Sequence, residues 1–383
     1  MTKEISDILA SFREAHSKSR RTALATVVHV EGSSYRRPGA RMLIEDNGKI
    51  TGAISGGCLE GDALRKALLA INQQQNKLVT YNTLNEDDVD FDVQLGCNGI
   101  VHILFEPIDP ASPNNPVALL EKCLLERKDT AVVTMFSLKN YYGLQPGTCV
   151  FFDGENTHEN ISDESLLSQV ITDASGVLKN KSSLLKEYTD QGLTAFIELV
   201  EPLVSLVIVG AGNDALPLME IASVLGWQIV VVDGRHTHVS KQRFPKAHQL
   251  VVGKPREAIS QLNIDEWTVV VLMTHNYNYD LEMLELLFQQ HCEYIGILGP
   301  KKRLQRMLCE LEDKGISITR EQKARIYGPT GLDIGAEAAE EIALSVLAEI
   351  KAVLSKKEGS FLRNHVDNIH EAPPVVVVET KNN

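Results

Sequence analysis

The sequence predicts an α/β protein in which an N-terminal α/β region is followed by a Rossmann-like doubly wound parallel sheet. From Val204 onward, short apolar strands alternate with helical segments, a pattern typical of a parallel sheet covered on both faces. A glycine-rich turn at 210–215 follows the apolar strand Leu206–Val209 and opens a helix, as in dinucleotide-binding folds. We expect this second part to span 203–355 and a charged tail to span 356–383.

Length and composition limit the classes of protein that the chain can be. Its 383 residues are enough for two or three domains, and its net charge of −13 argues against nucleic acid as the main partner. Because the chain has no run of about eighteen apolar residues and no secretory signal at its start, we expect a cytoplasmic protein without a membrane span. The six cysteines are widely spaced and form no CxxC pair, so we expect neither a disulfide framework nor a structural zinc site.

The N-terminal part, residues 1–202, is expected to contain helices and β-branched strands separated by glycine turns. A first helix is expected over 4–18, and a second one begins after Cys58. The expected strands are Thr22–Val30, Arg41–Glu45, Lys77–Tyr81 and Val101–Glu106.

Part of this region recurs within the chain at one ungapped offset. Five identities exceed the roughly two that average composition would give. The recurring residues are Thr22-Ala23, Thr26 and Pro38-Gly39, which reappear as Thr130-Ala131, Thr134 and Pro146-Gly147. The interpretation is a duplicated α/β unit, with candidate repeats at 20–108 and 128–202.

The most informative segment of the first repeat is Ser55-Gly56-Gly57-Cys58-Leu59-Glu60-Gly61, a cysteine among glycines at the start of a helix. Glycines allow a ligand to approach the backbone, and a helix N-terminus favours an anion or a thiolate. A similar loop, Leu95-Gly96-Cys97-Asn98-Gly99, follows. Both could equally be tight turns with small buried cysteines. The aligned segment of the second repeat, Asp163-Glu164-Ser165-Leu166, has neither glycine nor cysteine, which favours a function for the first loop.

The second part carries a dinucleotide-type motif. Gly210 would make the tight turn, and Gly212 would let a pyrophosphate approach the backbone. Asp233, at the end of the next strand, could accept a ribose hydroxyl. Asp214 argues against a phosphate at this turn, because it brings negative charge to the same helix end.

Three further segments of the second part could contact a ligand. His275 leaves a strand at its carboxyl end, and it could transfer a proton or be a purely structural histidine. Asp280 could cap the next helix. The basic segment 299–303 and the glycine-rich loop Gly328–Gly335 could hold an anion, or they could be solvated charge and a domain contact.

Together these segments resemble the XdhC/CoxI family, the accessory proteins of xanthine dehydrogenase and related molybdenum hydroxylases. The resemblance extends from about residue 20 to residue 350. It runs through Gly32-Ser33-Ser34, Pro38-Gly39-Ala40, the Cys58 loop, Gly96-Cys97, Gly210-Ala211-Gly212, Asp233-Gly234-Arg235, Met273-Thr274-His275, Gly299 and Gly328–Gly335. Three residues depart from the family pattern: Tyr35 replaces a usual proline, Asn98 a usual glycine, and Asn213 a common histidine.

The resemblance implies a cytoplasmic homodimer that binds the molybdenum cofactor, as molybdopterin or its dinucleotide form. Such a protein would protect the cofactor during sulfuration by a cysteine desulfurase and insert it into an apo-hydroxylase of the xanthine dehydrogenase type. Cys58 and Cys97 would contact the molybdenum, relay sulfur or only close the pocket, and His275 would transfer a proton. The predicted cofactor-binding residues are Arg36, Arg37, Arg41, Ser55, Gly56, Gly57, Cys58, Gly96, Cys97, Gly210, Gly212, Asp233, Arg235, Gly331 and Asp333.

Two other functions stay open at the level of sequence. The Rossmann-like part could bind NAD(P) for an oxidoreductase with His275 as acid or base, although no familiar dehydrogenase constellation is present. The chain could also be a scaffold whose acidic surface docks a hydroxylase and a desulfurase. The sequence favours a maturation factor over a catalyst.

Overall fold

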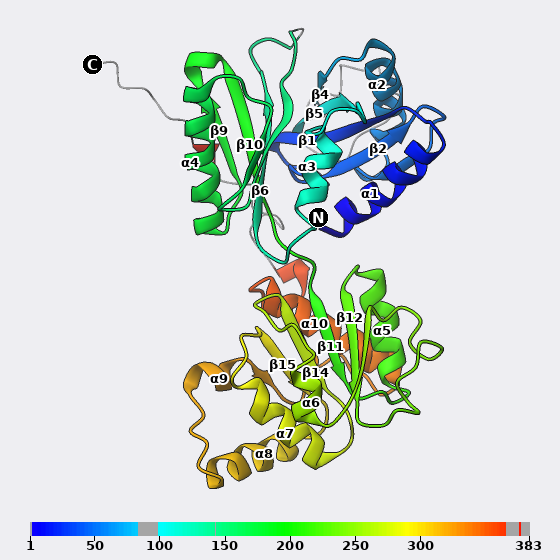
Figure 1. Cartoon of the computed structure of the whole chain (residues 1–383), viewed down its shortest axis with the longest axis vertical. Helices are drawn as coiled ribbons and strands as arrows, with labels where there is room; N and C mark the ends of the chain where they lie inside the picture. Colours follow the sequence, from blue (N-terminus) through cyan, green and yellow to red (C-terminus); the bar gives the residue numbers. More distant parts are fainter. Residues whose placement is uncertain (1, 83–98, 142, 365–374, 377–383) are drawn as a thin grey trace, which may run out of the picture. The chain divides into compact units, whose positions relative to one another are not determined.

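The computed structural model describes residues 2–82, 99–141, 143–364 and 375–376, which form two compact units (Figure 1). Unit 1 comprises Met1–Pro202 with His370–Asn383, and unit 2 comprises Leu203–Ile369. Among the described residues, no helix has both the length and the apolar character that crossing a bilayer requires.

Unit 1 contains two sheets that share one strand order. The first has the order β3-β2-β1-β5-β4, and the second has the order β8-β7-β6-β10-β9 with β17 added beside β9. All neighbours are antiparallel except β17 and β9, which are parallel. The strands of the first sheet are β1 (Thr22–Gly32), β2 (Arg41–Glu45), β3 (Ile50–Gly52), β4 (Lys77–Asn82) and β5 (Gly99–Pro107). Those of the second are β6 (Thr130–Phe136), β7 (Gly147–Phe152), β8 (Thr157–Glu159), β9 (Leu184–Tyr188), β10 (Leu193–Val200) and β17 (Val375–Val376).

The helices in the described part of unit 1 are α1 (Thr2–Ser17), α2 (Glu60–Gln73), α3 (Pro116–Lys122) and α4 (Glu164–Asn180). A short 3-10 turn, Thr189–Gln191, precedes β10. Helix α2 buries its alanine face on the first sheet, and α4 covers the second sheet in the same way (Figure 1). The opposite faces of the two sheets share a core in which Leu104 meets Phe136 and Phe196. The two sheets therefore form the inner layers of unit 1.

Two buried glutamates, Glu106 and Glu198, each bind a residue of the opposite sheet. We call them the reciprocal carboxylates. Glu106 of β5 accepts from the N–H of Thr148 in β7 at 2.6 Å and from its hydroxyl at 2.9 Å. Glu198 of β10 accepts from Nη1 of Arg41 in β2 at 3.1 Å and also from Nη2. The two glutamates occupy corresponding positions of β5 and β10 in the strand registers. Each sheet thus supplies the partner of a polar group in the other.

Glu106 is expected to make the stability of the protein depend on pH. Burial raises its pKa to about 7, although the hydrogen bonds from Thr148 oppose the shift. Between pH 4.5 and 7 the folded state keeps a proton that the unfolded state releases, so stability falls as pH rises. We expect wild type to lose about 3 kcal/mol more than Glu106→Gln between pH 4.5 and pH 8, measured by urea denaturation. Glu155 is exposed, so the control variant Glu155→Gln should show the same pH dependence of the unfolding free energy as wild type. If the unfolding free energy of Glu106→Gln changed with pH as that of wild type does, the pH dependence could not be assigned to Glu106.

Unit 2 is built on one six-stranded parallel sheet, in the order β13-β12-β11-β14-β15-β16. Helices on both faces bury its central strands, which explains their continuous Val, Ile and Leu runs. The strands are β11 (Ser205–Val209), β12 (Gln228–Asp233), β13 (Gln249–Val252), β14 (Thr268–Leu272), β15 (Tyr294–Ile297) and β16 (Ile326–Tyr327). The helices are α5 (Ala215–Val224), α6 (Pro255–Ile259), α7 (Tyr277–Leu287), α8 (Lys301–Asp313), α9 (Arg320–Ala324), α10 (Ala339–Leu354) and the 3-10 turn Leu362–Asn364. This order confirms the predicted Rossmann-like doubly wound sheet.

Candidate functional site

The glycine-cysteine loop of unit 1, residues 53–59, connects β3 to α2 and is held by Ser55 and Glu60. The Ser55 hydroxyl donates to the Glu60 carboxylate and accepts from the N–H groups of Gly57 and Leu59, both at 3.1 Å. The N–H of Ser55 donates to the same carboxylate at 2.9 Å. Burial favours the neutral acid, but the hydrogen bonds from Ser55 outweigh it and lower the pKa of Glu60. The carboxylate form therefore anchors the loop.

The tip of this loop presents a thiol to solvent. Gly56, Gly57 and Cys58 are exposed, and the Cys58 Sγ lies 3.6 Å from the buried Ser55 hydroxyl. Gly57 has φ of +110° with open space around it, and a Cβ at Gly56 would come 3.4 Å from the ring of Tyr35. Because the loop's own hydroxyl and carboxylate engage three of its N–H groups, those groups are not available to an anion, contrary to expectation. The reactive group that the loop offers is the thiol.

The three predicted arginines have different surroundings. Arg36 is half-buried and forms an ion pair with Glu4, whereas Arg37 is exposed. Arg41 is only 1% exposed and is bound by Glu198. Burial opposes its charge, but the adjacent carboxylate prevails and raises the pKa of Arg41. Arg41 is therefore an internal ion-pair partner, which corrects the expectation of a ligand contact.

The second glycine-cysteine loop, with Gly96 and Cys97, lies outside the described residues. Its last glycine, Gly99, begins β5 opposite Gly32 at the end of β1. A Cβ at Gly99 would come 2.3 Å from the carbonyl oxygen of Ser33. This close approach of two backbones requires glycine at the point where the loop ends.

In unit 2, the turn after β11 has the close backbone packing that its motif predicts. Gly210 has φ of +127°, and a Cβ there would lie 2.5 Å from the carbonyl oxygen of Met273. Asp233 ends β12 and accepts from the N–H of Ala211 at 2.8 Å and from the backbone and guanidinium of Arg235. Burial opposes ionisation, but these donors lower the pKa of Asp233. Both oxygens of Asp233 are thus engaged within the chain, which corrects the expectation of a free acceptor for a ribose hydroxyl.

A carboxylate–histidine pair lies beside this turn. His275 is exposed, has φ of +58°, and places Nε2 2.8 Å from Oδ2 of Asp214. The other carboxylate oxygen of Asp214 lies only 2.4 Å from the Cβ position of Gly212. The acidic group therefore stands where a pyrophosphate would approach Gly212.

Some of the remaining predicted residues of unit 2 form hydrogen bonds within the chain. The N–H of Gly331 donates to Glu349 at 3.0 Å, whereas Asp333 is exposed. Asp280 does not cap α7, because Asn276 is the N-cap residue of that helix. Asp280 is instead fully buried and accepts from Arg303 at 2.5 Å.

The structure brings some of the predicted residues together in two groups. The carboxyl ends of β11, β12 and β14 bring together the Gly210 turn, Asp233, Arg235 and His275. The second group is the Cys58 loop of unit 1. Sequence reasoning missed the anchoring role of Glu60, which a hydroxyl and a carboxylate flanking a helix start could have indicated.

The fold and these two groups define a two-unit α/β protein that combines a Rossmann-type unit with a unit bearing an exposed glycine-cysteine loop. Residues 206–350 match the XdhC Rossmann domain, and residues 15–82 match the XdhC and CoxI family. The chain belongs to the XdhC and CoxI family, which confirms the resemblance seen in its sequence.

Three similar proteins cover most of the chain. A probable xanthine dehydrogenase subunit of Bacillus subtilis (strain 168) is 33% identical over 327 residues, which are 85% of this chain and 91% of that protein. The molybdenum cofactor insertion chaperone PaoD of Escherichia coli (strain K12) is 25% identical over 94% of this chain and 93% of its own length. A crystal structure of a xanthine dehydrogenase from Bacillus halodurans is 29% identical, with a TM-score of 0.75, over 93% of this chain and 98% of that one.

Proposed function

We propose that the chain is an accessory protein that binds the molybdenum cofactor, protects it during sulfuration and inserts it into an apo-hydroxylase of the xanthine dehydrogenase type. The observation that carries the proposal is the Cys58 thiol, held at the exposed tip of a loop that Ser55 and Glu60 fix. The relative PaoD, whose name is that of a molybdenum cofactor insertion chaperone, supports the choice of cargo.

In this proposal the cofactor is cargo, and the chain supplies soft sulfur donors to its metal end. Cys58 is the first donor, and Cys97 is retained as a second one. Exposure of Cys58, and the absence of described atoms within 4 Å of a Cβ at Gly57, support an approach of the ligand to the tip of the loop. Arg37 is exposed and stays a proposed cationic contact of the cofactor, whereas Arg41 is buried and is no longer proposed as one. A cysteine desulfurase, the apo-hydroxylase and a second copy of the chain are the proposed partners.

Cys58→Ser tests the role of the thiol. Because Cys58 is exposed and its thiol makes only one long polar contact within the described part of the chain, the substitution should leave the fold intact. We expect it to lower the cofactor retained by protein purified from a cofactor-producing cell, and the activation of an apo-hydroxylase, about tenfold or more. Oxidised-pterin fluorescence and molybdenum analysis measure the first quantity, and turnover by the hydroxylase measures the second.

The matched control for this test is Cys309→Ser, because Cys309 is the other exposed cysteine among the described residues and lies on α8 of unit 2. It should retain and transfer the cofactor as wild type does. Equal retention and equal activation by Cys58→Ser would remove Cys58 from the site. Pull-down of the partner enzymes by protein that never carries pterin would favour a docking scaffold instead.

An NAD(P)-dependent oxidoreductase is the second candidate, and the Gly210 turn with its parallel strand order supports it. Two features weigh against it: Asp233 is bound by Arg235, and Asp214 places negative charge at the turn. Calorimetric titration with NAD⁺ and NADP⁺ separates the two candidates. Micromolar binding by pterin-free protein would favour the oxidoreductase.

A further inference from the structure

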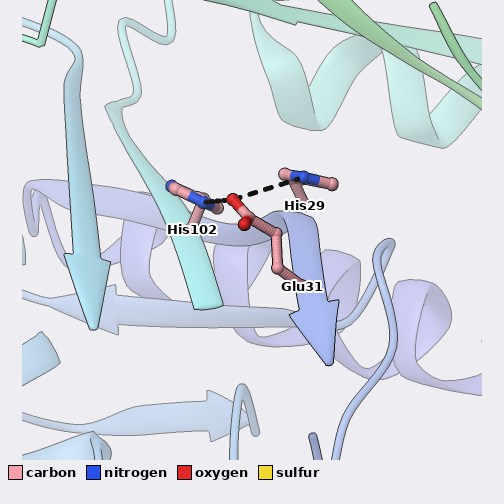
Figure 2. Close-up of side chains that lie close together, drawn as sticks. All are labelled: His29, Glu31 and His102. Carbon is pink, nitrogen blue, oxygen red and sulfur yellow. Dashed lines mark hydrogen bonds and ion pairs between the residues drawn. The ribbon is translucent and has the colours of Figure 1, made fainter. Parts of the chain in front are cut away.

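A cluster of three metal-ligating side chains, His29, Glu31 and His102, lies on the first sheet of unit 1 (Figure 2). The Glu31 Oε1 is 3.1 Å from Nε2 of His102 and 3.7 Å from Nε2 of His29. One ligand atom from each of the three side chains lies within 4.8 Å of the other two. The two imidazole rings are stacked, with centroids 5.2 Å apart.

A β-bulge in β1 creates this cluster. Val27 pairs with Ile103, but His29 rather than Val28 pairs with His102. The bulge shifts the alternation of side chains by one residue, so that His29 and Glu31 share one face of the sheet with His102. In the second sheet, β6 and β10 pair in continuous register, so this strand pairing does not itself require a bulge. The pairing of β1 with β5 therefore contains a bulge that the corresponding pairing of β6 with β10 lacks.

The surroundings of the cluster resemble those of a bound metal. His102 is buried, and its Nδ1 lies 2.9 Å from the hydroxyl of Thr80, which can fix the ring and its tautomer. The Thr80 hydroxyl can either donate to Nδ1, which leaves an Nε2–H to donate to Glu31, or accept from an Nδ1–H, which leaves the Nε2 lone pair facing Glu31. The second tautomer is the one that can bind a cation through Nε2. Glu31 is half-exposed and leaves one side of the cluster open to solvent.

We propose that His29, Glu31 and His102 bind a first-row divalent transition-metal ion such as Zn²⁺. Two imidazole nitrogens and one carboxylate oxygen are a ligand set that such ions accept, with the remaining positions left to water or a ligand. Bonds of about 2.0–2.2 Å to a tetrahedral ion separate neighbouring donors by about 3.4 Å, close to the two separations at Glu31. Small rotations of the exposed Glu31 and of His29 complete the site. The proposal is independent of cofactor insertion.

Zn²⁺ titration of the full chain tests the proposal, after chelator treatment and dialysis, with binding followed by calorimetry. We expect one Zn²⁺ per chain at micromolar affinity or tighter, and Co²⁺ in its place should give the visible absorption of a low-coordinate site. Glu31→Gln and His29→Gln should each weaken Zn²⁺ binding about tenfold or more. Circular dichroism of the metal-free variants checks that they remain folded.

Two controls distinguish this cluster from adventitious binding. His236 and His238 are two residues apart in a loop of unit 2, and the variant His236→Gln/His238→Gln should bind Zn²⁺ as wild type does. Cys58→Ser should also leave Zn²⁺ binding unchanged, so the result does not depend on the proposed cofactor site. Absence of stoichiometric binding, or a loss of affinity in either control but not in Glu31→Gln and His29→Gln, would overturn the proposal.

Discussion

Replacing Glu198 by alanine is expected to destabilise the protein by about 3–5 kcal/mol, because it leaves the buried guanidinium of Arg41 without the carboxylate that binds it. Arg41 and Glu198 are 1% and 0% exposed, so water cannot take the place of the lost carboxylate. The apolar double variant Arg41→Met/Glu198→Leu should recover most of the loss, since it removes both charges at similar volume. Urea denaturation of wild type, Glu198→Ala and the apolar double variant measures the loss and its recovery.

The exposed ion pair between Lys246 and Glu220 provides the control for this prediction. Its side chains are 44% and 48% exposed, so Glu220→Ala should cost less than about 1 kcal/mol. A loss of similar size in both single variants would mean that burial of the Arg41 pair does not determine its contribution. Failure of the apolar double variant to recover stability would assign the loss to packing instead of charge.

Gly210→Ala should destabilise unit 2 by about 4 kcal/mol. The positive φ of Gly210 costs a residue with a Cβ about 1–3 kcal/mol, and the contact with the Met273 carbonyl adds about 1–3 kcal/mol of overpacking. The contacted atoms belong to the backbone after β14, so the end of that strand must move away from β11. Thermal and urea denaturation measure the loss.

Gly315 separates the two contributions to this loss. It also has a positive φ, of +81°, but a Cβ there would meet nothing within 4 Å. Gly315→Ala should therefore show only the backbone term, of about 1–3 kcal/mol. Equal losses in the two variants would contradict the close approach at Gly210.

Local patterning was enough to predict several elements of both units. The continuous apolar runs of β11 and β14 indicate strands buried on both faces, and the Gly210 turn between strand and helix indicates the Rossmann-like order. The start of α2 after Cys58 follows from the apolar residues of one helix face. The strands, the turn and the helix start depend on residues close to one another in the sequence, so they can be predicted from a single sequence.

The misassigned residues depend on partners distant in sequence. Arg41 follows two other arginines and resembles a surface cation, but it begins a strand whose five residues are all buried. Its partner Glu198 lies 157 residues away, within a mostly apolar strand. Asp280 likewise could cap a helix by its position in the sequence, and it is instead the buried partner of Arg303. A charged residue inside an apolar strand is the signal that could have indicated such pairs.

The His29 cluster was missed for a different physical reason. The alternation of His29 and Glu31 predicts that they share a strand face, but His102 joins them only because of the register shift between β1 and β5. A bulge changes which residues oppose one another without a marked change in hydrophobic pattern. Strand elements can therefore be predicted correctly while their cross-strand partners are not.

The reciprocal carboxylates also bear on how unit 1 folds and on how its parts could be separated. Glu106 of the first sheet accepts hydrogen bonds from the second, and Glu198 of the second sheet binds Arg41 of the first. A cut between the two sheets would therefore leave polar groups of each fragment without their partners. The similar strand orders would suggest two modules that can be expressed singly or exchanged. Because their hydrogen bonds cross from one sheet to the other, we expect the two sheets to fold as a single cooperative unit, in which neither half is a minimal domain.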